Sequence, residues 1–400
     1  MPPQTARNVS QAFTHITPDL QLERDCRRVV LVGFNAYDMA SMALVTPTAF
    51  RTQGGRSGRE AIGAAFRAAA RRGHNVARVW AHSSDPKFPF QVAPGVYLEA
   101  ALAGLDWVVA DAAAAGLQLV LSFVDNWKYY NGMDQYVDWS STAPPRTQPR
   151  PADVPGDPAG LGPRKRKAAG TSAAPGGGGD GGGGGMGADG PVGVAAADPY
   201  EAHRHSLFFS DPGSRELFRS HIATIVNRRN TYTGRLYRDE PAILAWNLAN
   251  EPRCEAWANK ACNHILQEWI VEMSAHVRQL DPNHLITIGS EGFFGPSTPD
   301  LLPYNPGGWA AELGQDFVAN NAAPHIDYAT VHLWPDNWES GANYANFLNS
   351  WLASHLAAAS VLLHKPVLLE EFGKKVIRMV SLSGIGRWSF PLRTPPPFPA

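Results

Sequence analysis

The sequence predicts an α/β protein built as a (β/α)8 barrel, a ring of parallel strands surrounded by helices. Apolar, β-branched runs alternate along the chain with Ala-rich amphipathic stretches. The runs lack a polar face, as strands do when helices cover a parallel sheet. Each run also ends in polar or aromatic residues, where such a barrel carries its site. A doubly wound sheet is the alternative, but no GxGxxG motif opens the first helix.

Seven strands and the helices between them can be followed in order. The helix at 59–73 has an Ala/Arg pattern of helical spacing and closes at Gly73. The other expected helices cover residues 97–116, 218–230, 264–282 and 344–360. The expected strands, read from their apolar and β-branched runs, cover residues 28–37, 75–82, 117–127, 241–252, 284–292, 326–334 and 365–373.

Low-complexity sequence interrupts this pattern at residues 143–199. Eleven of the 38 glycines fall between positions 176 and 190, a composition that cannot bury a core, so we expect a disordered insertion. The basic run Arg164–Lys167 inside it is read as solvated charge rather than a nuclear address. We therefore expect an N-terminal extension at 1–27, a barrel domain at 28–375 and an irregular tail at 376–400.

The segment after the seventh strand does not continue the alternation. The apolar run VIRMVSL begins three residues after Gly373, too soon for the crossover of about a dozen residues that a parallel strand requires. Prolines such as Pro391 and Pro395 then leave no room for a strand. The sequence therefore predicts that the eighth strand is missing and that the chain is truncated.

Composition excludes several kinds of partner. Lys and Arg number 35 against 36 Asp and Glu, so the net charge of -1 provides no basic field for nucleic acid or anionic lipid. No run of about 18 apolar residues predicts a membrane span, and the N-terminus lacks the apolar core of a signal peptide. The three cysteines form neither a disulfide framework nor a zinc motif; a single Cys254–Cys262 bridge stays open.

Two glutamates end apolar runs that lie far apart in the sequence. Glu251 lies in Asn-Glu-Pro after one run, and Glu371 precedes Phe-Gly after another. Glycoside hydrolysis needs one carboxylic acid to protonate the leaving oxygen and one carboxylate to attack the anomeric carbon or activate water. A single Glu at a strand end is commonly a surface residue, but two in such contexts favour this chemistry. Alternation along the strand predicts that Glu370 points the opposite way.

Several separated motifs resemble glycoside hydrolase family 5 and, within it, the endo-β-1,4-mannanases of plants and fungi. Asn-Glu-Pro alone is typical of a wider set of barrel glycosidases, whereas NEPRC together with HLWPDNW is more selective. The resemblance covers about residues 30–375 apart from the insertion. It rests on VGFNAY (32–37), ARVWAH (77–82), FFSDP (208–212), NTYTGRLYRDEPAILAWNLANEPRC (230–254), SEGFFG (290–295), VHLWPDNW (331–338) and LLEEFGK (368–374).

The resemblance implies roles for particular residues. Glu251 would be the general acid/base and Glu371 the nucleophile of a retaining mechanism. Arg78 would keep the nucleophile charged, Asn250 would bind the sugar 2-hydroxyl, and His332 would orient the site.

Aromatic and polar positions would bind the rest of the substrate. Trp80, Trp127 and Trp338 match aromatic residues that line the sugar subsites, and Arg253 and Glu291 match polar contacts near the cleavage point. Trp334 stands where many members carry tyrosine, and its indole N–H can donate a hydrogen bond towards the nucleophile.

The resemblance implies an endo-acting enzyme that needs neither a metal nor a cofactor. Its expected partner is a polysaccharide substrate, namely mannan, glucomannan or galactomannan, and it is expected to act as an extracellular monomer. Two alternatives stay open: a related β-1,4-glucanase, and a non-catalytic polysaccharide-binding barrel left inactive by truncation.

Overall fold

The computed structural model describes residues 12–44, 58–82, 88–127, 132–144, 204–255, 260–338 and 344–373. The expectations for most of the insertion, for the first residues of the extension and for the tail at 376–400 lie outside these ranges. None of the helices in these ranges has both the length and the apolar character that crossing a membrane requires.

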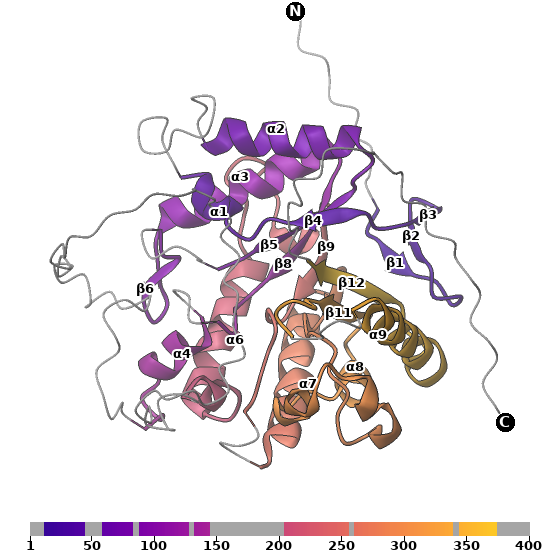
Figure 1. The fold of residues 1–400 in the computed structure, drawn as a ribbon. Helices are drawn as coiled ribbons and strands as arrows, with labels where there is room; N and C mark the ends of the chain where they lie inside the picture. Colours follow the sequence, from indigo (N-terminus) through magenta and orange to yellow (C-terminus); the bar gives the residue numbers. More distant parts are fainter. Residues whose placement is uncertain are drawn as a thin grey trace, which may run out of the picture.

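Seven parallel strands in the described ranges form the wall of the barrel (Figure 1). One sheet has the order β10-β9-β8-β5-β4, and β11 pairs with β12. The amide N–H of Asp327 donates to Ile286 O over 2.8 Å and that of His332 to Glu291 O over 3.0 Å, which joins β11 to the edge at β10. The strands are β4 (Gly33–Asn35), β5 (Val76–Trp80), β8 (Gln118–Ser122), β9 (Ile243–Asn247), β10 (Leu285–Thr287), β11 (Ala329–Leu333) and β12 (Val367–Phe372). The predicted α/β barrel class is confirmed.

Helices pack outside this wall, and capping residues fix where several of them begin or end. The Asp211 side chain accepts from Ser214 N and Pro212 opens the helix, which fixes the start of α6. Gly116, at φ 78°, ends α3 in the left-handed conformation that glycine adopts without strain. The helices are α1 (Met39–Met42), α2 (Gly58–Arg71), α3 (Glu99–Ala115), α4 (Met133–Trp139), α6 (Pro212–Val226), α7 (Cys262–Leu280), α8 (Phe317–Asn321) and α9 (Tyr344–Ala358), which a π-helical turn, Ala359–Leu363, extends.

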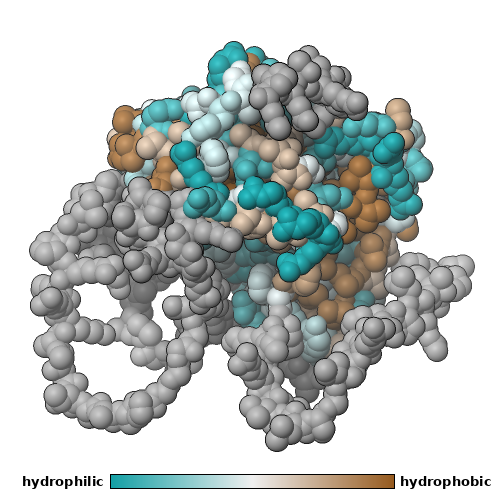
Figure 2. All heavy atoms as spheres, turned by 90° about the horizontal axis from the view of Figure 1, so that it is seen from above, coloured by the Kyte–Doolittle hydropathy of each residue, from teal (hydrophilic) through white to brown (hydrophobic). Residues whose placement is uncertain are grey.

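Helix α2 shows how these helices divide their faces. It buries Ile62 and Phe66 towards the barrel and carries charged residues such as Glu60 and Arg71 at its ends. Figure 2 looks down on this side of the molecule, where hydrophilic side chains cover much of the surface and apolar ones form separate patches.

The first predicted strand, residues 28–37, is divided between two elements. Its start belongs to β3 (Arg27–Val29), which forms a small antiparallel sheet with β1 (His15–Ile16) and β2 (Leu22–Arg24). Its end forms β4 in the barrel. A second antiparallel pair, β6 (Gln91–Ala93) and β7 (Val96–Tyr97), lies between β5 and α3 in the chain.

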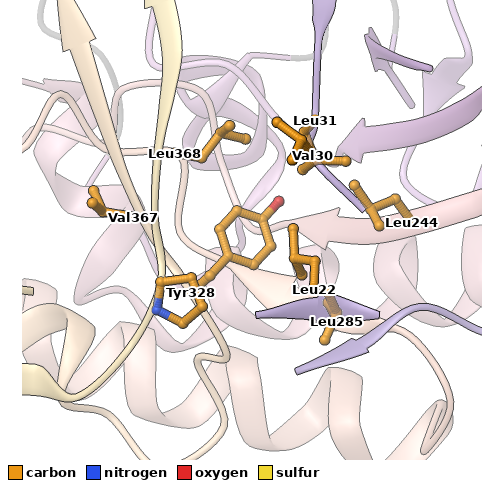
Figure 3. Close-up of a pocket in the computed structure, with 9 residues that line it drawn as sticks. Leu22, Val30, Leu31, Leu244, Leu285, Tyr328, Val367 and Leu368 are labelled. Carbon is orange, nitrogen blue, oxygen red and sulfur yellow. The ribbon is translucent and has the colours of Figure 1, made fainter. Parts of the chain in front are cut away.

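An apolar cavity of about 210 Å³ lies at the amino-terminal ends of the strands (Figure 3). Leu22 of β2 reaches it from the small antiparallel sheet, and the buried Tyr328 hydroxyl beside it has no hydrogen-bond partner within the described part of the chain. Its lining is Leu22, Val30, Leu31, Leu244, Leu285, Tyr328, Pro366, Val367 and Leu368. Apart from the Tyr328 hydroxyl, the lining side chains are apolar, so the cavity holds no pair of groups that could act as acid and base.

Aromatic rings form the core between α4, α6 and α7. Phe218 of α6 lies 5.1 Å from Phe208 and 5.6 Å from Trp269, measured between ring centroids. Tyr136 of α4 meets the same ring edge-on at 5.7 Å. All four side chains are fully buried, so this cluster holds the helices to one another and to the wall.

Removing one of these rings should destabilise the protein markedly. Phe218→Ala should lower the free energy of unfolding by about 3–5 kcal/mol, because a buried ring leaves a cavity that its neighbours fill only in part. Val271→Ala on α7 is the control, since that side chain is 38% exposed and should cost far less. Urea denaturation of both variants measures the difference; equal midpoints would contradict the packing described.

Candidate active site

The carboxyl ends of the strands bring charged side chains together. Arg78 comes from β5, Glu251 follows β9, His332 lies on β11 and Glu371 on β12. All four are buried. Because parallel strands end at one rim, residues far apart in the sequence make contact here, as Arg78 and Glu371 do across 293 positions.

Glu251 is held by both neighbouring strands. Asn250 N donates to Val124 O at 2.7 Å, and Glu251 N donates to Gly289 O at 2.8 Å. Glu251 itself has φ 48°, a left-handed conformation that is uncommon for a residue with a long side chain and is retained where the surrounding structure enforces it. The carboxylate then meets His332 Nδ1 at 2.8 Å and accepts from Trp127 Nε1 at 2.8 Å.

Glu371 faces Glu251 across the site. Its carboxylate forms an ion pair with Arg78 and accepts from Trp334 Nε1 at 3.2 Å. One carboxylate oxygen of Glu251, one of Glu371 and a ring nitrogen of His332 all lie within 4.8 Å of one another. This spacing agrees with the separation of about 5–5.5 Å between the carboxyl groups of retaining glycosidases.

The same three groups are spaced as metal ligands can be, but their chemistry does not fit a resident ion. Arg78 already neutralises Glu371, and His332 Nδ1 lies within hydrogen-bond distance of Glu251. A divalent cation would have to compete with the guanidinium and with the ring proton for these atoms. The arrangement is better suited to proton transfer and to nucleophilic attack.

Glu370 also points into the site, so the expectation that it would point away is wrong. In the pairing of β11 with β12, Val331 lies opposite Leu369 and His332 opposite Glu371, which leaves Glu370 as an extra residue. This irregularity interrupts the alternation of side chains along the strand. The Glu370 side chain is 2% exposed and lies 3.3 Å from Arg78 Nε.

Asn250 is fixed by two partners. Its Oδ1 accepts from Arg78 Nη2 at 2.9 Å, and its Nδ2 donates to Asp125 Oδ1 at 3.0 Å. These two contacts assign the orientation of the amide and leave one Nδ2 hydrogen for another acceptor. Asp125 was not singled out from the sequence, although it lies near the end of a predicted strand just as Glu251 does.

Arg253 and Glu291 form a second ion pair close to Glu251. Arg253 Nε donates to Glu291 Oε1 at 2.6 Å, and its guanidinium lies over the Trp127 ring at 4.6 Å from the centroid. Gln315, also missed from the sequence, donates to Glu291.

The remaining predicted aromatic residues are placed differently. Trp80 lies beneath the Arg78 guanidinium, with 4.7 Å between the charged carbon and the ring centroid. Trp338 is 5% exposed and packs against Phe293 and Trp351, each at 5.4 Å between centroids.

Burial and neighbouring charges act against each other in setting the pKa values of Glu251 and His332. Burial lowers the pKa of His332, but the charge of Glu371 and the hydrogen bonds to Glu251 and Glu370 raise it to about 10. Burial raises the pKa of Glu251, yet the hydrogen bond from His332 and the nearby cations outweigh burial and place it below its ordinary value. At neutral pH a proton is therefore shared within the Glu251–His332 pair and resides mainly on the imidazole.

One disulfide closes the segment that follows the site. Cys254 and Cys262 are bonded, with their Cα atoms 5.3 Å apart, while Cys26 is free and exposed. The bridge that the sequence left open is therefore formed. It ties the residues directly after Arg253 to the start of α7.

The family model and the curated relatives that match this chain agree with one another. Residues 13–378 match a family described as "GH family 5 beta-mannosidase-like". "Mannan endo-1,4-beta-mannosidase 1" of Arabidopsis thaliana is 33% identical over 352 residues, which are 87% of this chain and 68% of that protein. The rice protein of the same name, from Oryza sativa subsp. japonica, is 36% identical over 347 residues, covering 86% of this chain and 64% of the relative.

A solved structure agrees with these matches. The X-ray structure of the endo-β-1,4-mannanase from Thermotoga petrophila aligns with a TM-score of 0.56 and 27% identity, over 86% of this chain and 60% of that one. The chain spans about two thirds of the length of the curated relatives it matches.

Asp125 should make the stability of the protein depend on pH. Burial raises its pKa to about 7 from 3.8. Between about pH 4 and pH 7 the folded state then holds a proton that the unfolded chain has released, so the free energy of unfolding falls as pH rises through this window. One pKa unit corresponds to about 1.4 kcal/mol. The free energy of unfolding above pH 7 is therefore lower than that below pH 4 by at most about 4 kcal/mol on account of Asp125.

Asp125→Asn should remove this contribution, since an amide does not titrate. Urea denaturation at several pH values between 4 and 8 should give a flatter dependence for the variant than for the wild type. Asp300→Asn, at an exposed position, is the matched control. Parallel curves for wild type and Asp125→Asn would contradict the assignment.

Proposed function

The chain belongs to the β-mannosidase-like group of glycoside hydrolase family 5, and from that premise we propose that it is an endo-β-1,4-mannanase. It hydrolyses internal β-1,4-mannosidic bonds of mannan-type polysaccharides with retention of anomeric configuration. The observation that carries the proposal is the pair Glu251 and Glu371, which face each other with an oxygen of each within 4.8 Å.

The geometry supports a double displacement. In the first step Glu371 attacks the anomeric carbon while Glu251 gives its proton to the glycosidic oxygen, so the bond to the leaving sugar breaks as the glycosyl–enzyme ester forms. In the second step Glu251 takes a proton from water, the hydroxide oxygen bonds to the anomeric carbon, and Glu371 leaves as a carboxylate. Both glutamates end as they began.

Three neighbours support these roles. Arg78 forms an ion pair with Glu371, which favours its anionic form as a nucleophile. His332, at 2.8 Å from Glu251, is placed to exchange a proton with the acid/base. Asn250 keeps one amide hydrogen for the sugar 2-hydroxyl, since its other contacts are taken by Arg78 and Asp125.

The substrate would extend across the aromatic side of the rim. Trp127 contacts Glu251 and stacks under Arg253, which places a flat ring beside the acid/base. Sugar rings pack their C–H faces on such planes. The family resemblance adds the expectation of an extracellular monomer that works without a metal or cofactor, and this is part of the proposal.

Replacing either glutamate should abolish most of the hydrolysis. Glu251→Gln removes the general acid/base and should lower the rate on mannan by about 10²–10⁴-fold, the usual contribution of such a group. Glu371→Gln removes the nucleophile and should leave only residual activity. Glu268→Gln on α7 is the control, because that carboxylate is exposed and outside the site.

The measurement is release of reducing ends from mannan, glucomannan and carboxymethyl cellulose, with folding of each variant checked by circular dichroism. A folded Glu251→Gln variant with full activity on mannan would refute the role of Glu251. Faster turnover of the cellulose derivative than of any mannan would show a β-1,4-glucanase instead.

Trp127→Phe should shift the pH profile upward while keeping a flat ring. The indole N–H donates to Glu251 Oε2 at 2.8 Å, and this bond stabilises the charged form of the acid/base. Its loss should raise the upper limb of the kcat/KM profile by about one pH unit, because hydrogen bonds to charged groups contribute about 1.5–3 kcal/mol. An unchanged upper limb, with only KM altered, would restrict Trp127 to substrate stacking.

A further inference from the structure

Glu370 is a buried carboxylate that the double displacement does not use. Asn247 Nδ2 donates to its two oxygens at 3.1 and 3.2 Å, Arg78 Nε lies 3.3 Å from it, and His332 Nε2 lies 3.4 Å from it. These partners come from β9, β5 and β11, so Glu370 of β12 connects four strands of the barrel. A carboxylate with so many partners is unlike the ordinary surface glutamate that strand alternation predicts.

The irregular pairing of β12 is what turns Glu370 inward. An uninterrupted strand would place Glu370 and Glu371 on opposite faces. The extra residue opposite Val331 and His332 allows both side chains to point into the site. The Asn35 side chain holds this part of the strand from β4, since its Nδ2 donates to Glu370 O at 2.9 Å.

Glu370 and Glu251 lie at the two ends of one imidazole ring. His332 Nδ1 is 2.8 Å from Glu251 Oε1, and His332 Nε2 is 3.4 Å from Glu370 Oε2. A ring flanked by two carboxylates is favoured in its doubly protonated form, because each nitrogen then donates. The ring is also fully buried, so no water competes for these protons.

We propose that Glu370 is a positioning residue of the reaction, which retains the proton shared by His332 and Glu251 and holds Arg78 against Glu371. The proposal rests on the proposed glycosidase function and adds a residue through which the acid/base and the nucleophile are adjusted together. Glu370 acts through His332 and Arg78 and does not contact the sugar.

The proton balance follows from the contacts. In the resting site the Nδ1 proton faces Glu251, and its transfer to Oε1 leaves Glu251 a neutral acid and His332 a neutral ring that keeps its Nε2 proton towards Glu370. Glu251 then gives that proton to the glycosidic oxygen. In the second step the proton taken from water by Glu251 restores the pair.

Charged and titratable groups surround the Glu370–His332 pair from each neighbouring strand. The cation Arg78 opposes the negative charge, and burial keeps the nearby phenol of Tyr328 neutral by raising its pKa. Burial raises the pKa of Glu370, but Arg78 and His332 outweigh it and lower the pKa below its ordinary value. The groups facing the pair are Arg78, Glu251, Glu291, Tyr328 and Glu371.

Glu370→Gln should move the upper limb of the kcat/KM profile on mannan to lower pH. Loss of a buried negative charge makes the Glu251–His332 pair release its last proton more readily, which lowers the upper limb. The upper limb should move by about one pH unit. Glu370→Asp, which keeps the charge, should restore the position of the profile even if the rate stays reduced.

A merely structural role would lower the rate without moving either limb, and that result would overturn the proposal. The matched control is Asp281→Asn, which also removes a buried carboxylate paired with a histidine, His284, but outside the site. Its profile should keep the wild-type limbs.

Nuclear magnetic resonance of the wild-type protein tests whether the His332 ring retains its proton, and it needs no variant at Glu370. With ¹⁵N-labelled histidine, and His332 assigned by its absence in His332→Gln, both ring nitrogens should remain protonated at pH 8. A neutral His332 ring at that pH would overturn the proposal whether or not Glu370→Gln folds. Absence of hydrolysis by the wild type would instead count against the proposed function. The protonation state of His332 in this spectrum would then still test the role of Glu370.

Discussion

Neutralisation of buried carboxyl groups is the constraint on which this site depends. Several carboxyl groups share one rim, and an unpaired charge in such a place would cost several kcal/mol. Each has a cation within ion-pair distance: Arg78 serves two of them, Arg253 one, and His332 lies between three. The carboxyl groups are those of Glu251, Glu291, Glu370 and Glu371. Loss of Arg78 or of His332 would therefore disturb more than one carboxylate.

The barrel makes this charge balance possible by delivering each residue from a different strand. Parallel strands expose their carboxyl ends at one rim, so Arg78, His332 and Glu371 meet although the chain separates them widely. The opposite ends of the strands are apolar and surround a cavity with no paired charge (Figure 3). The charged side chains and the apolar cavity thus lie at opposite ends of the wall.

The fold could be predicted because its signal is repetitive, whereas two details of the site could not. Buried parallel strands are short apolar runs, and each predicted run contains a strand of the structure. Glu370 was assigned to the wrong face because alternation assumes a regular strand, and the letters LLEEF do not reveal the extra residue in the pairing of β12. Asp125 could have been found by the strand-end rule that identified Glu251. Its contact with Asn250, 125 positions away, required the structure.

We propose that Glu371, and not its neighbour Glu370, forms the covalent bond to the sugar while Glu251 serves as acid and base. A mannoside with fluorine at carbon 2 and a good leaving group would trap this ester, because fluorine slows both steps and the good leaving group speeds only the first. Mass spectrometry of the digested protein should then find one sugar attached to Glu371 in a peptide that contains both glutamates. A sugar on Glu370, or turnover with inversion and no trapped ester, would rule out Glu371 as the nucleophile.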